Sequence, residues 1–249
     1  MDEGKSVAIA DQLKGKQSTL PQREATSQEL DWYKELIGNQ LRTIELKAEQ
    51  TLVELKLKGL MGDSAGIAGL IYVSFVPPKM ELDKAEFEKA YPELFSRYLM
   101  PQPDKISGSF SVKGKPTKRD IPEQLAKAIK DMERTVAAVE IDPDKQALQE
   151  ISDDARELYT GFLERKSEIV QLSLKADVIE ARLKEACGQH IGIDGICNWE
   201  RVLKPQKPKL DISALKSEKS ELYELFLTER ASTTRVSLRP YRVLVGASG

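Results

Sequence analysis

The chain has 249 residues, of which 31% are charged, 40% are hydrophobic and 6% are aromatic. Average globular chains carry about 25% charged and about 45–50% apolar residues, so this composition favours long, solvent-exposed helices over a compact α/β enzyme. The formal net charge of −2 excludes an overall electrostatic field of either sign.

Several further classes of protein are disfavoured. No apolar run approaches the roughly 18–20 residues of a membrane span, and the acidic Met1-Asp2-Glu3 start lacks the apolar stretch of a secretory signal. We therefore expect a cytoplasmic protein with no membrane partner. Cys187 and Cys197 form neither a disulfide framework nor a zinc-site spacing with His190, the single histidine. We expect Cys187 on the core-facing side of a helix, His190 in a turn, and neither metal nor cofactor.

The N-terminal part combines a tail and a long helix. Residues 1–26 are polar and interrupted by glycine and proline, which predicts a flexible tail. From Ser27 to Met61 apolar or small residues recur at steps of three and four: Leu30, Tyr33, Ile37, Leu41, Ile44, Ala48, Leu52 and Leu55. This spacing predicts an amphipathic helix about 50 Å long, which ends at Gly62.

The next segments predict short strands around a shorter helix. Residues 69–76 are rich in β-branched and aromatic side chains, which favours a strand. Residues 82–100 predict a helix with Asp83 as its N-cap. Residues 107–112 alternate weakly and predict a returning strand.

A second long helix follows a linker. Residues 113–144 predict a basic loop and a helix near 122–139. Residues 145–187 carry a heptad stripe of Ala155, Leu158, Phe162, Ile169, Leu172, Ala176, Ile179, Leu183 and Ala186. Arg165 is the polar exception on that stripe. Further strands are expected at 195–203 and 234–246.

The strongest pattern is an internal repeat. Three matches show it: Leu46-Lys47-Ala48-Glu49 with Leu174-Lys175-Ala176-Asp177, Gly62-xxx-Gly66-Ile67-x-Gly69 with Gly188-xxx-Gly192-Ile193-x-Gly195, and Glu93-Leu94-Phe95 with Glu221-Leu222-Tyr223. The offset is 128 on the helix (174 − 46), 126 in the glycine motif (188 − 62) and 128 afterwards (221 − 93). We therefore predict a first copy at 27–112, a linker at 113–144 and a second copy at 145–249.

These elements predict an α+β fold that is mainly helical. Two long helices, antiparallel or in a coiled coil, would each be followed by a small β-hairpin and short-helix unit, and an internal pseudo-twofold duplication would relate the two. A single amphipathic helix cannot bury its apolar stripe alone, so the two copies should pack on each other.

The second copy resembles a known family. Its motifs are Leu183-Lys-Glu-Ala-Cys-Gly188, Gly192-Ile-Asp-Gly195, Cys197-Asn-Trp199-Glu200, Leu210-Asp211, Glu221-Leu222-Tyr223 and Thr233-Thr234-Arg235-Val236. Together they resemble the helix and β-hairpin tail that follows the nuclease domain of YqaJ-type (lambda-exonuclease-like) phage recombination exonucleases. The likeness covers roughly residues 174–245, and more loosely 46–112. Glu200 replaces the lysine that usually follows the tryptophan.

The family's nuclease centre is not matched. It requires an acidic residue and a Glu-x-Lys motif on adjacent strands to hold Mg²⁺ through carboxylate oxygens. The one candidate, Glu54-Leu55-Lys56, falls in the middle of the first predicted long helix. The resemblance therefore implies a phage recombination context in a bacterial host cell, without nuclease activity.

Clusters of basic side chains are the candidate working surface. The DNA-binding candidates are Lys113, Lys115, Lys118, Arg119, Trp199, Arg201, Lys204, Lys207, Lys209, Arg235 and Arg239. Cations on loops and strand edges can neutralise phosphates, and Trp199 could stack a base. The alternative is that the lysines keep strand edges soluble and that Trp199 is hairpin core.

Two functions fit the sequence. The first is a non-enzymatic DNA recombination or repair accessory that binds DNA, or binds a phage exonuclease, annealase or single-strand-binding protein. The second is a coiled-coil interaction or inhibitor protein that acts on a host nuclease or another protein. A homo-oligomer is compatible with both.

Overall fold

A computed structural model describes residues 3–74, 79–137, 147–229 and 237–240 of the chain. The fold is α+β and mainly helical, as expected. It contains two compact units: a long-helix unit of Met1–Val73, Ser107–Val202 and Leu238–Gly249, and a short-helix unit of Ser74–Ile106 and Leu203–Ser237. Each unit combines segments of both predicted copies, so the compact units are not the copies themselves.

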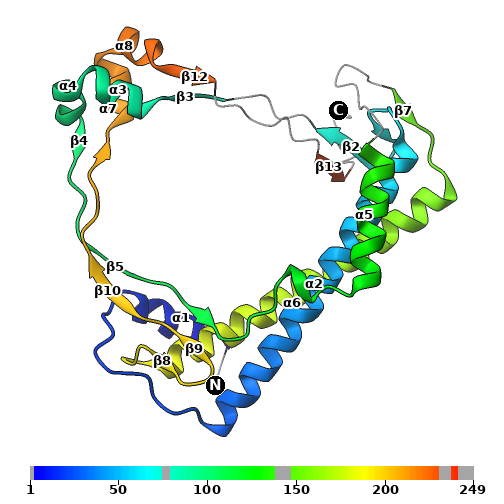
Figure 1. Cartoon of the computed structure of the whole chain (residues 1–249), viewed down its shortest axis with the longest axis horizontal. Helices are drawn as coiled ribbons and strands as arrows, with labels where there is room; N and C mark the ends of the chain where they lie inside the picture. The colour runs from blue at the N-terminus through cyan, green and yellow to red at the C-terminus, as the bar shows by residue number, and fades with distance from the viewer. Residues whose placement is uncertain (1–2, 75–78, 138–146, 230–236, 241–249) are drawn as a thin grey trace, which may run out of the picture. The chain divides into compact units, whose positions relative to one another are not determined.

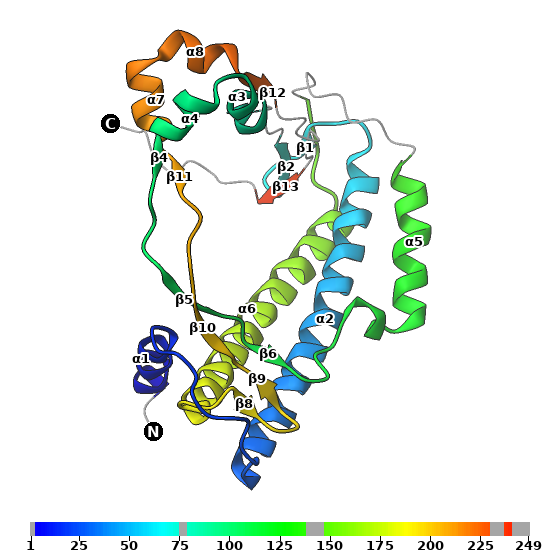
Figure 2. The same cartoon turned by 60° about the vertical axis from the view of Figure 1, so that its left-hand side comes forward.

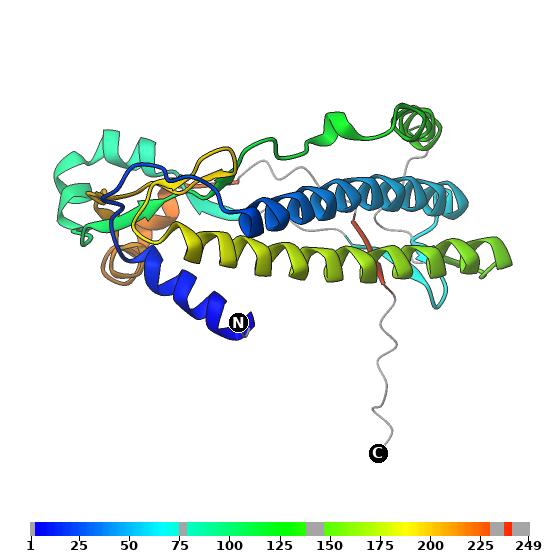
Figure 3. The ribbon, with the colours of Figure 1, turned by 90° about the horizontal axis from the view of Figure 1, so that it is seen from below.

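Two antiparallel helices form the centre of the long-helix unit (Figure 3). Helix α2 spans Ser27–Met61 and helix α6 spans Asp153–Cys187. Arg42 lies 3.1 Å from Glu168 and Arg165 lies 2.9 Å from Glu49, which fixes the opposite directions of the two helices. The bounds predicted for α2 are confirmed.

Helix α6 begins later than predicted. Residues 145–146 lie outside the described residues, and Leu148–Gln149 form strand β7 instead. Ser152 caps the helix by accepting a hydrogen bond from the amide of Ala155 at 3.2 Å. The apolar stripe could not reveal this boundary, because a cap depends on a local side-chain hydrogen bond and not on periodicity.

The predicted stripe of α6 faces the interior, but the stripe predicted for α2 is not its buried face, because Leu30 and Leu41 are exposed and Ala48 is the one predicted position that is buried. Other residues of α2 form the buried face: Leu36, Leu46, Val53, Leu57 and Met61.

At one end of the helix pair Leu36, Ile179 and Leu183 are buried in one cluster. At the other end Leu57 and Ala155 belong to a second cluster. Arg165, the predicted polar exception, bonds Glu49 and the carbonyl of Gly161 within its own helix (2.9 Å).

Shorter helices flank the pair. Helix α1 (Glu3–Lys14) lies beside α6, whereas α5 (Glu123–Ala137) lies beside α2 (Figure 2). A 3-10 turn, η1, spans Lys118–Asp120. The linker helix expected near 122–139 is therefore present over its described part.

In place of the flexible tail predicted over residues 1–26, residues 3–26 contain helix α1 and make backbone contacts with distant parts of the chain. Beyond α1, the amide of Ser18 donates to the carbonyl of Arg201 (2.9 Å), and the amide of Thr19 donates to that of Gln189 (2.9 Å). Arg23 forms a parallel bridge with Ile193. Polar composition gave no sign of these backbone contacts, because every residue except proline carries an amide donor.

Two small sheets lie at the ends of the helix pair (Figure 1). One has the order β13-β2-β1-β7 and the other β6-β9-β8. Their strands are β1 (Gly66–Ile67), β2 (Ile71–Ser74), β6 (Ser111–Val112), β7 (Leu148–Gln149), β8 (Gly192–Ile193), β9 (Cys197–Asn198) and β13 (Ser237–Pro240). The closing strand of each half of the chain therefore pairs with the hairpin of the other half.

Glycine is required in the first strand of each hairpin. A Cβ atom added to Gly66 would overlap the carbonyl oxygen of Ile71, and one added to Gly192 would overlap that of Cys197. The two hairpins share one register, with Gly66 opposite Tyr72 and Gly192 opposite Asn198.

The short-helix unit contains two pairs of short helices and two strand pairs. The helices are α3 (Lys84–Ala90), α4 (Pro92–Arg97), α7 (Ile212–Glu218) and α8 (Ser220–Leu225). Strand β3 (Met80–Leu82) pairs with β12 (Leu227–Glu229), and β4 (Leu99–Met100) pairs with β11 (Lys209–Leu210). Phe87, Phe95 and Leu215 form its buried core.

The single helix expected over 82–100 is two helices. Pro92 takes the first position of α4, where its missing amide costs no hydrogen bond. Asp83 caps α3 as predicted, accepting from the amides of Ala85 and Glu86.

Strands β5 (Lys105–Gly108) and β10 (Arg201–Lys204) pair with each other, and the unit boundary falls within both. Of the helices in the described residues, none combines the length and apolar character needed to cross a membrane.

Candidate nucleic-acid interface

The predicted basic loop is exposed on the long-helix unit. Lys115, Lys118 and Arg119 are all exposed there. Lys113 instead forms an ion pair with Asp194 at 3.2 Å, and this contact lowers the pKa of the Asp194 carboxyl. Three of the four cations therefore remain available to a ligand.

Trp199 and Arg201 are not surface residues, so their assignment as DNA contacts is corrected. Both are at least 98% buried. The Arg201 guanidinium lies 4.2 Å from the centroid of the Trp199 ring. It donates to the carbonyl of Leu13 at 2.8 Å, to the carbonyl of Gly188, and to the hydroxyl of Ser18 at 3.1 Å.

Arg201 therefore holds two helix ends. Leu13 lies in the last turn of α1, and Gly188 is the C-cap of α6. Carbonyls at a helix C-terminus lack amide partners and attract cations. Burial lowers the pKa of Arg201, which is the expected cost of moving a charge out of water. The alternative role for Trp199, as hairpin core, is confirmed.

The second basic cluster lies in the short-helix unit, apart from Arg201 at the start of β10, which belongs to the long-helix unit. Lys204, Lys207 and Lys209 are exposed. Lys204 ends β10, and Lys209 begins β11 opposite Met100. These three lysines form the basic segment of the short-helix unit.

Arg235 lies outside the described residues, and Arg239 lies in β13. Their role in DNA binding stays a prediction.

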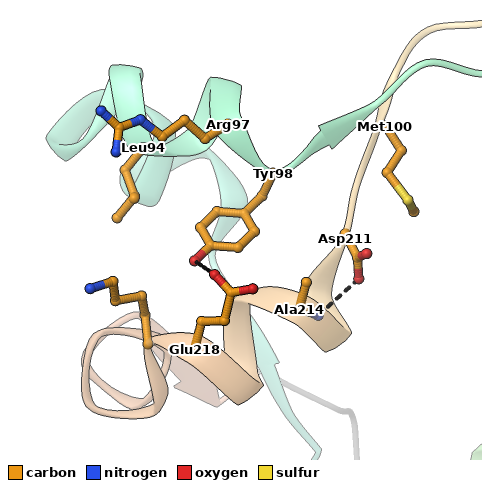
Figure 4. A pocket seen from close by; sticks show the side chains of 8 residues that line it. Leu94, Arg97, Tyr98, Met100, Asp211, Ala214 and Glu218 are labelled. Carbon is orange, nitrogen blue, oxygen red and sulfur yellow. Dashed lines mark hydrogen bonds between the residues drawn. The ribbon is translucent and has the colours of Figure 1, made fainter.

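A pocket of about 360 Å³ lies close to the basic segment, within the same unit. Figure 4 shows Tyr98 at its centre, with Leu94 and Arg97 beyond one edge of the ring and Met100 and Asp211 beyond the other. Ala214, Glu218 and Lys219 complete the lining.

Hydrogen bonds hold the polar groups of this pocket. The Tyr98 hydroxyl donates to the Glu218 carboxylate at 2.8 Å, and this bond raises the pKa of Tyr98. Asp211 accepts from the amide of Ala214 at 2.9 Å. This pocket was not predicted from the sequence. The offset of 128 contained one signal for it, because it places Lys219 where the first copy has Tyr91 (219 − 91).

A larger groove lies in the long-helix unit, between α2, α5 and α6. It has a volume of about 1240 Å³, and its lining combines apolar side chains such as Leu60, Met132 and Leu158 with charged ones such as Lys56 and Asp154.

The residues considered for catalysis lie as expected. Glu54 is in the middle of α2 and not on a strand, and burial raises the pKa of its carboxyl. Cys187 is buried at the end of α6, with its sulfur 3.7 Å from that of Cys197. His190 ends the turn that follows α6, where its amide donates to the carbonyl of Cys187 at 2.8 Å, and it also forms a parallel bridge with Leu20. Among the described residues, no three His, Cys, Asp or Glu side chains are grouped to hold a metal.

Comparison with protein-family models gave no match, and comparison with curated proteins and with solved structures gave none either.

Proposed function

We propose that this chain is a non-enzymatic accessory of phage or mobile-element DNA recombination that binds single-stranded nucleic acid through its short-helix unit. The observation that carries the proposal is the basic segment, in which Lys204, Lys207 and Lys209 are exposed within six residues of chain. Exposed lysines spaced along an extended segment of protein can contact successive phosphates of a nucleic acid, and the release of counterions then drives binding.

The proposal also rests on an internal duplication. Helices α2 and α6 each have 35 residues and begin 126 residues apart (153 − 27). In the short-helix unit Leu82 pairs with Leu227, and Leu210 pairs with Leu99, so a shift of 128 exchanges the two pairs. Two unrelated helix-strand segments would have no reason to reproduce each other's register.

The similarity between the two copies also includes the segments that precede the long helices α2 and α6. Arg23 bridges Ile193 as Gln149 pairs with Ile67, both in parallel, and both pairs are related by a shift of 126. Helix α1 beside α6 likewise corresponds to α5 beside α2. We infer that each copy includes the short helix and the strand before its long helix.

The resemblance to the tail of YqaJ-type exonucleases supplies the biological setting of the proposal. Two such tails joined in one chain, with each closing strand paired to the other's hairpin, resemble a fused dimer. A phage exonuclease, an annealase or a single-strand-binding protein is the class of partner that this setting implies.

The test measures the affinity of the full chain for a short, fluorescein-labelled single-stranded oligonucleotide by fluorescence anisotropy. Replacing Lys204, Lys207 and Lys209 with alanine should weaken binding at low salt. The slope of log affinity against log salt should fall by about 0.7 for each phosphate that the variant no longer neutralises. A matched control replaces three exposed helix lysines, Lys47, Lys166 and Lys175, with alanine, which removes the same charge elsewhere.

Two results would contradict the proposal. One is no binding by the unmodified chain at low salt. The other is an equal loss of affinity in the basic-segment variant and the control variant, because that result would show attraction by overall charge alone.

The groove between α2, α5 and α6 favours a second candidate function, the inhibition of a nuclease by contact. Leu60 lines this groove and is 39% exposed, so its side chain is accessible to a partner. The test adds the chain to a purified YqaJ-type exonuclease and measures DNA digestion. Slower digestion that is restored by Leu60→Glu would support this candidate, and unchanged digestion would refute it.

A further inference from the structure

The short-helix unit contains two equivalent aromatic positions with different surroundings. Tyr98 follows α4 directly, as Phe226 follows α8 directly. The rings of Phe87 and Tyr91 both pack edge-on against Phe226, with centroids 5.5 and 5.8 Å from it. Phe226 is therefore covered by two aromatic neighbours from the same unit.

Tyr98 has no aromatic side chain at the corresponding places. A shift of 128 residues leads from Phe87 to Leu215 and from Tyr91 to Lys219. Leu215 is smaller and fully buried, and Lys219 lines the pocket of about 360 Å³. The pocket thus lies where the other half of the unit has an aromatic ring.

We propose that this pocket binds one nucleotide of a single strand, with the base on the ring of Tyr98 and the adjoining phosphate on Arg97 and Lys219. Pockets for small ligands typically have volumes of about 300–1000 Å³, so a base fits. Bases of single strands are commonly bound by stacking on aromatic rings. The inference rests on the proposed function and adds a ligand subsite to it.

The distribution of charge in the pocket suits this orientation. Figure 4 shows Arg97 beyond one edge of the Tyr98 ring and Asp211 beyond the other. A guanidinium can bind two phosphate oxygens at once. Asp211 and Glu218 each use one carboxylate oxygen in a bond within the protein. Their other oxygens can accept from the exocyclic amine of a base, as carboxylates accept from cytosine.

The basic segment leads to this pocket. Lys209 lies opposite Met100 in the β4–β11 pair, and Met100 lines the pocket. A strand whose phosphates follow Lys204, Lys207 and Lys209 would therefore pass its next nucleotide to Tyr98. An aromatic peptide side chain would also match the ring but would not use this line of cations, so nucleic acid is the better match.

The decisive experiment fills the pocket with the residues of the equivalent site. The double variant Glu218→Ala, Lys219→Tyr introduces the counterparts Ala90 and Tyr91 and leaves the net charge unchanged. Affinity of the full chain for a fluorescein-labelled single-stranded oligodeoxycytidylate should fall about fivefold to a hundredfold, the range for loss of one stacked base. A second variant, Tyr98→Leu, removes the stacking ring without adding another and should lose a similar factor.

A control variant, Glu88→Ala with Lys89→Tyr, makes the same exchange on the exposed surface of α3. It should bind like the unmodified chain. Thermal unfolding of all variants confirms that each is folded before its affinity is compared.

The outcomes separate the two proposals. A loss of affinity in both pocket variants and not in the control supports the pocket. If either pocket variant binds as the control does while the alanine variant of the basic segment binds weakly, the pocket proposal is overturned and the proposed function stands. If the unmodified chain does not bind the oligonucleotide at low salt, both proposals are overturned.

Discussion

Replacing Arg201 with methionine should lower the free energy of unfolding of the long-helix unit by about 3 kcal/mol. The methionine keeps the apolar stem but removes the three guanidinium hydrogen bonds to Leu13, Gly188 and Ser18. Each hydrogen bond from a charged donor contributes about 1.5–3 kcal/mol to stability, although the Leu13 carbonyl and the Ser18 hydroxyl each keep one backbone donor. Relief of the burial of the charge offsets part of that sum.

Tryptophan fluorescence during urea unfolding provides the assay. The chain has two tryptophans, and both Trp32 and Trp199 belong to the cluster at one end of the α2–α6 pair. Their emission therefore reports unfolding of the long-helix unit and not of the short-helix unit. At about 2–4 °C per kcal/mol for a chain of this size, the melting temperature should fall by about 6–12 °C.

Arg201→Lys is the matched variant. It keeps the charge but not the planar fork of donors, so its stability should lie between that of the methionine variant and that of the unmodified chain. If Arg201→Met unfolded at the same urea concentration as the unmodified chain and lost affinity for oligonucleotide, Arg201 would be a surface contact and the argument from burial would be wrong.

Three other changes test the fold and its dependence on pH. Gly66→Ala should destabilise the long-helix unit by about 2 kcal/mol or more, since the new Cβ overlaps a carbonyl. Gly38→Ala, in α2 with open space around it, should instead stabilise by about 0.5–1 kcal/mol; equal urea midpoints would contradict both. Burial raises the pKa of Glu29, but hydrogen bonds from Arg23 and Thr26 outweigh it and lower the pKa below 4.5. The stabilisation that the ionised Glu29 carboxylate contributes is therefore present above pH 4.5 and is lost as the pH falls through the lower pKa of the folded state. Glu29→Gln should flatten the acid limb of a urea-midpoint profile, and an unchanged limb would exclude this pair as its cause.

The exchange of strands has a consequence for any attempt to divide the chain. Strand β6 of the first half completes the sheet of β8 and β9, and β13 of the second half completes that of β1 and β2. A single half would leave hairpin edges without partners. Unpaired edges invite association with another chain, so a half expressed alone should pair with a second half.

The two helices illustrate what periodicity can predict. The helical spacing from Leu30 to Leu55 predicted the bounds of α2 but not its buried face, since Leu30 and Leu41 are exposed and Leu36 is buried instead. The stripe of α6 identified the buried face but not the N-terminus. The hydrogen bond that the amide of Ala155 donates to the Ser152 hydroxyl set that boundary.

The predicted DNA-binding residues show that residue type alone does not distinguish buried from exposed side chains. Trp199 and Arg201 are a base-stacking and phosphate-binding pair by residue type, and in sequence nothing distinguishes Arg201 from the exposed Lys204. Their burial depends on Ser18 and on the helix ends at Leu13 and Gly188, which are distant along the chain or across a turn. Only the tertiary structure brings those acceptors together.

The high charge and few aromatic residues of the sequence already implied long, exposed helices, since such helices need only one apolar face. The sequence by itself also determined the helix ends at glycine and the matching glycine motifs of the two halves, because both are local patterns. Which half supplies each strand, which cations face water, and where Tyr98 lacks an aromatic neighbour depended on tertiary contacts. These features arise from pairing between residues more than a hundred positions apart, which no local pattern encodes.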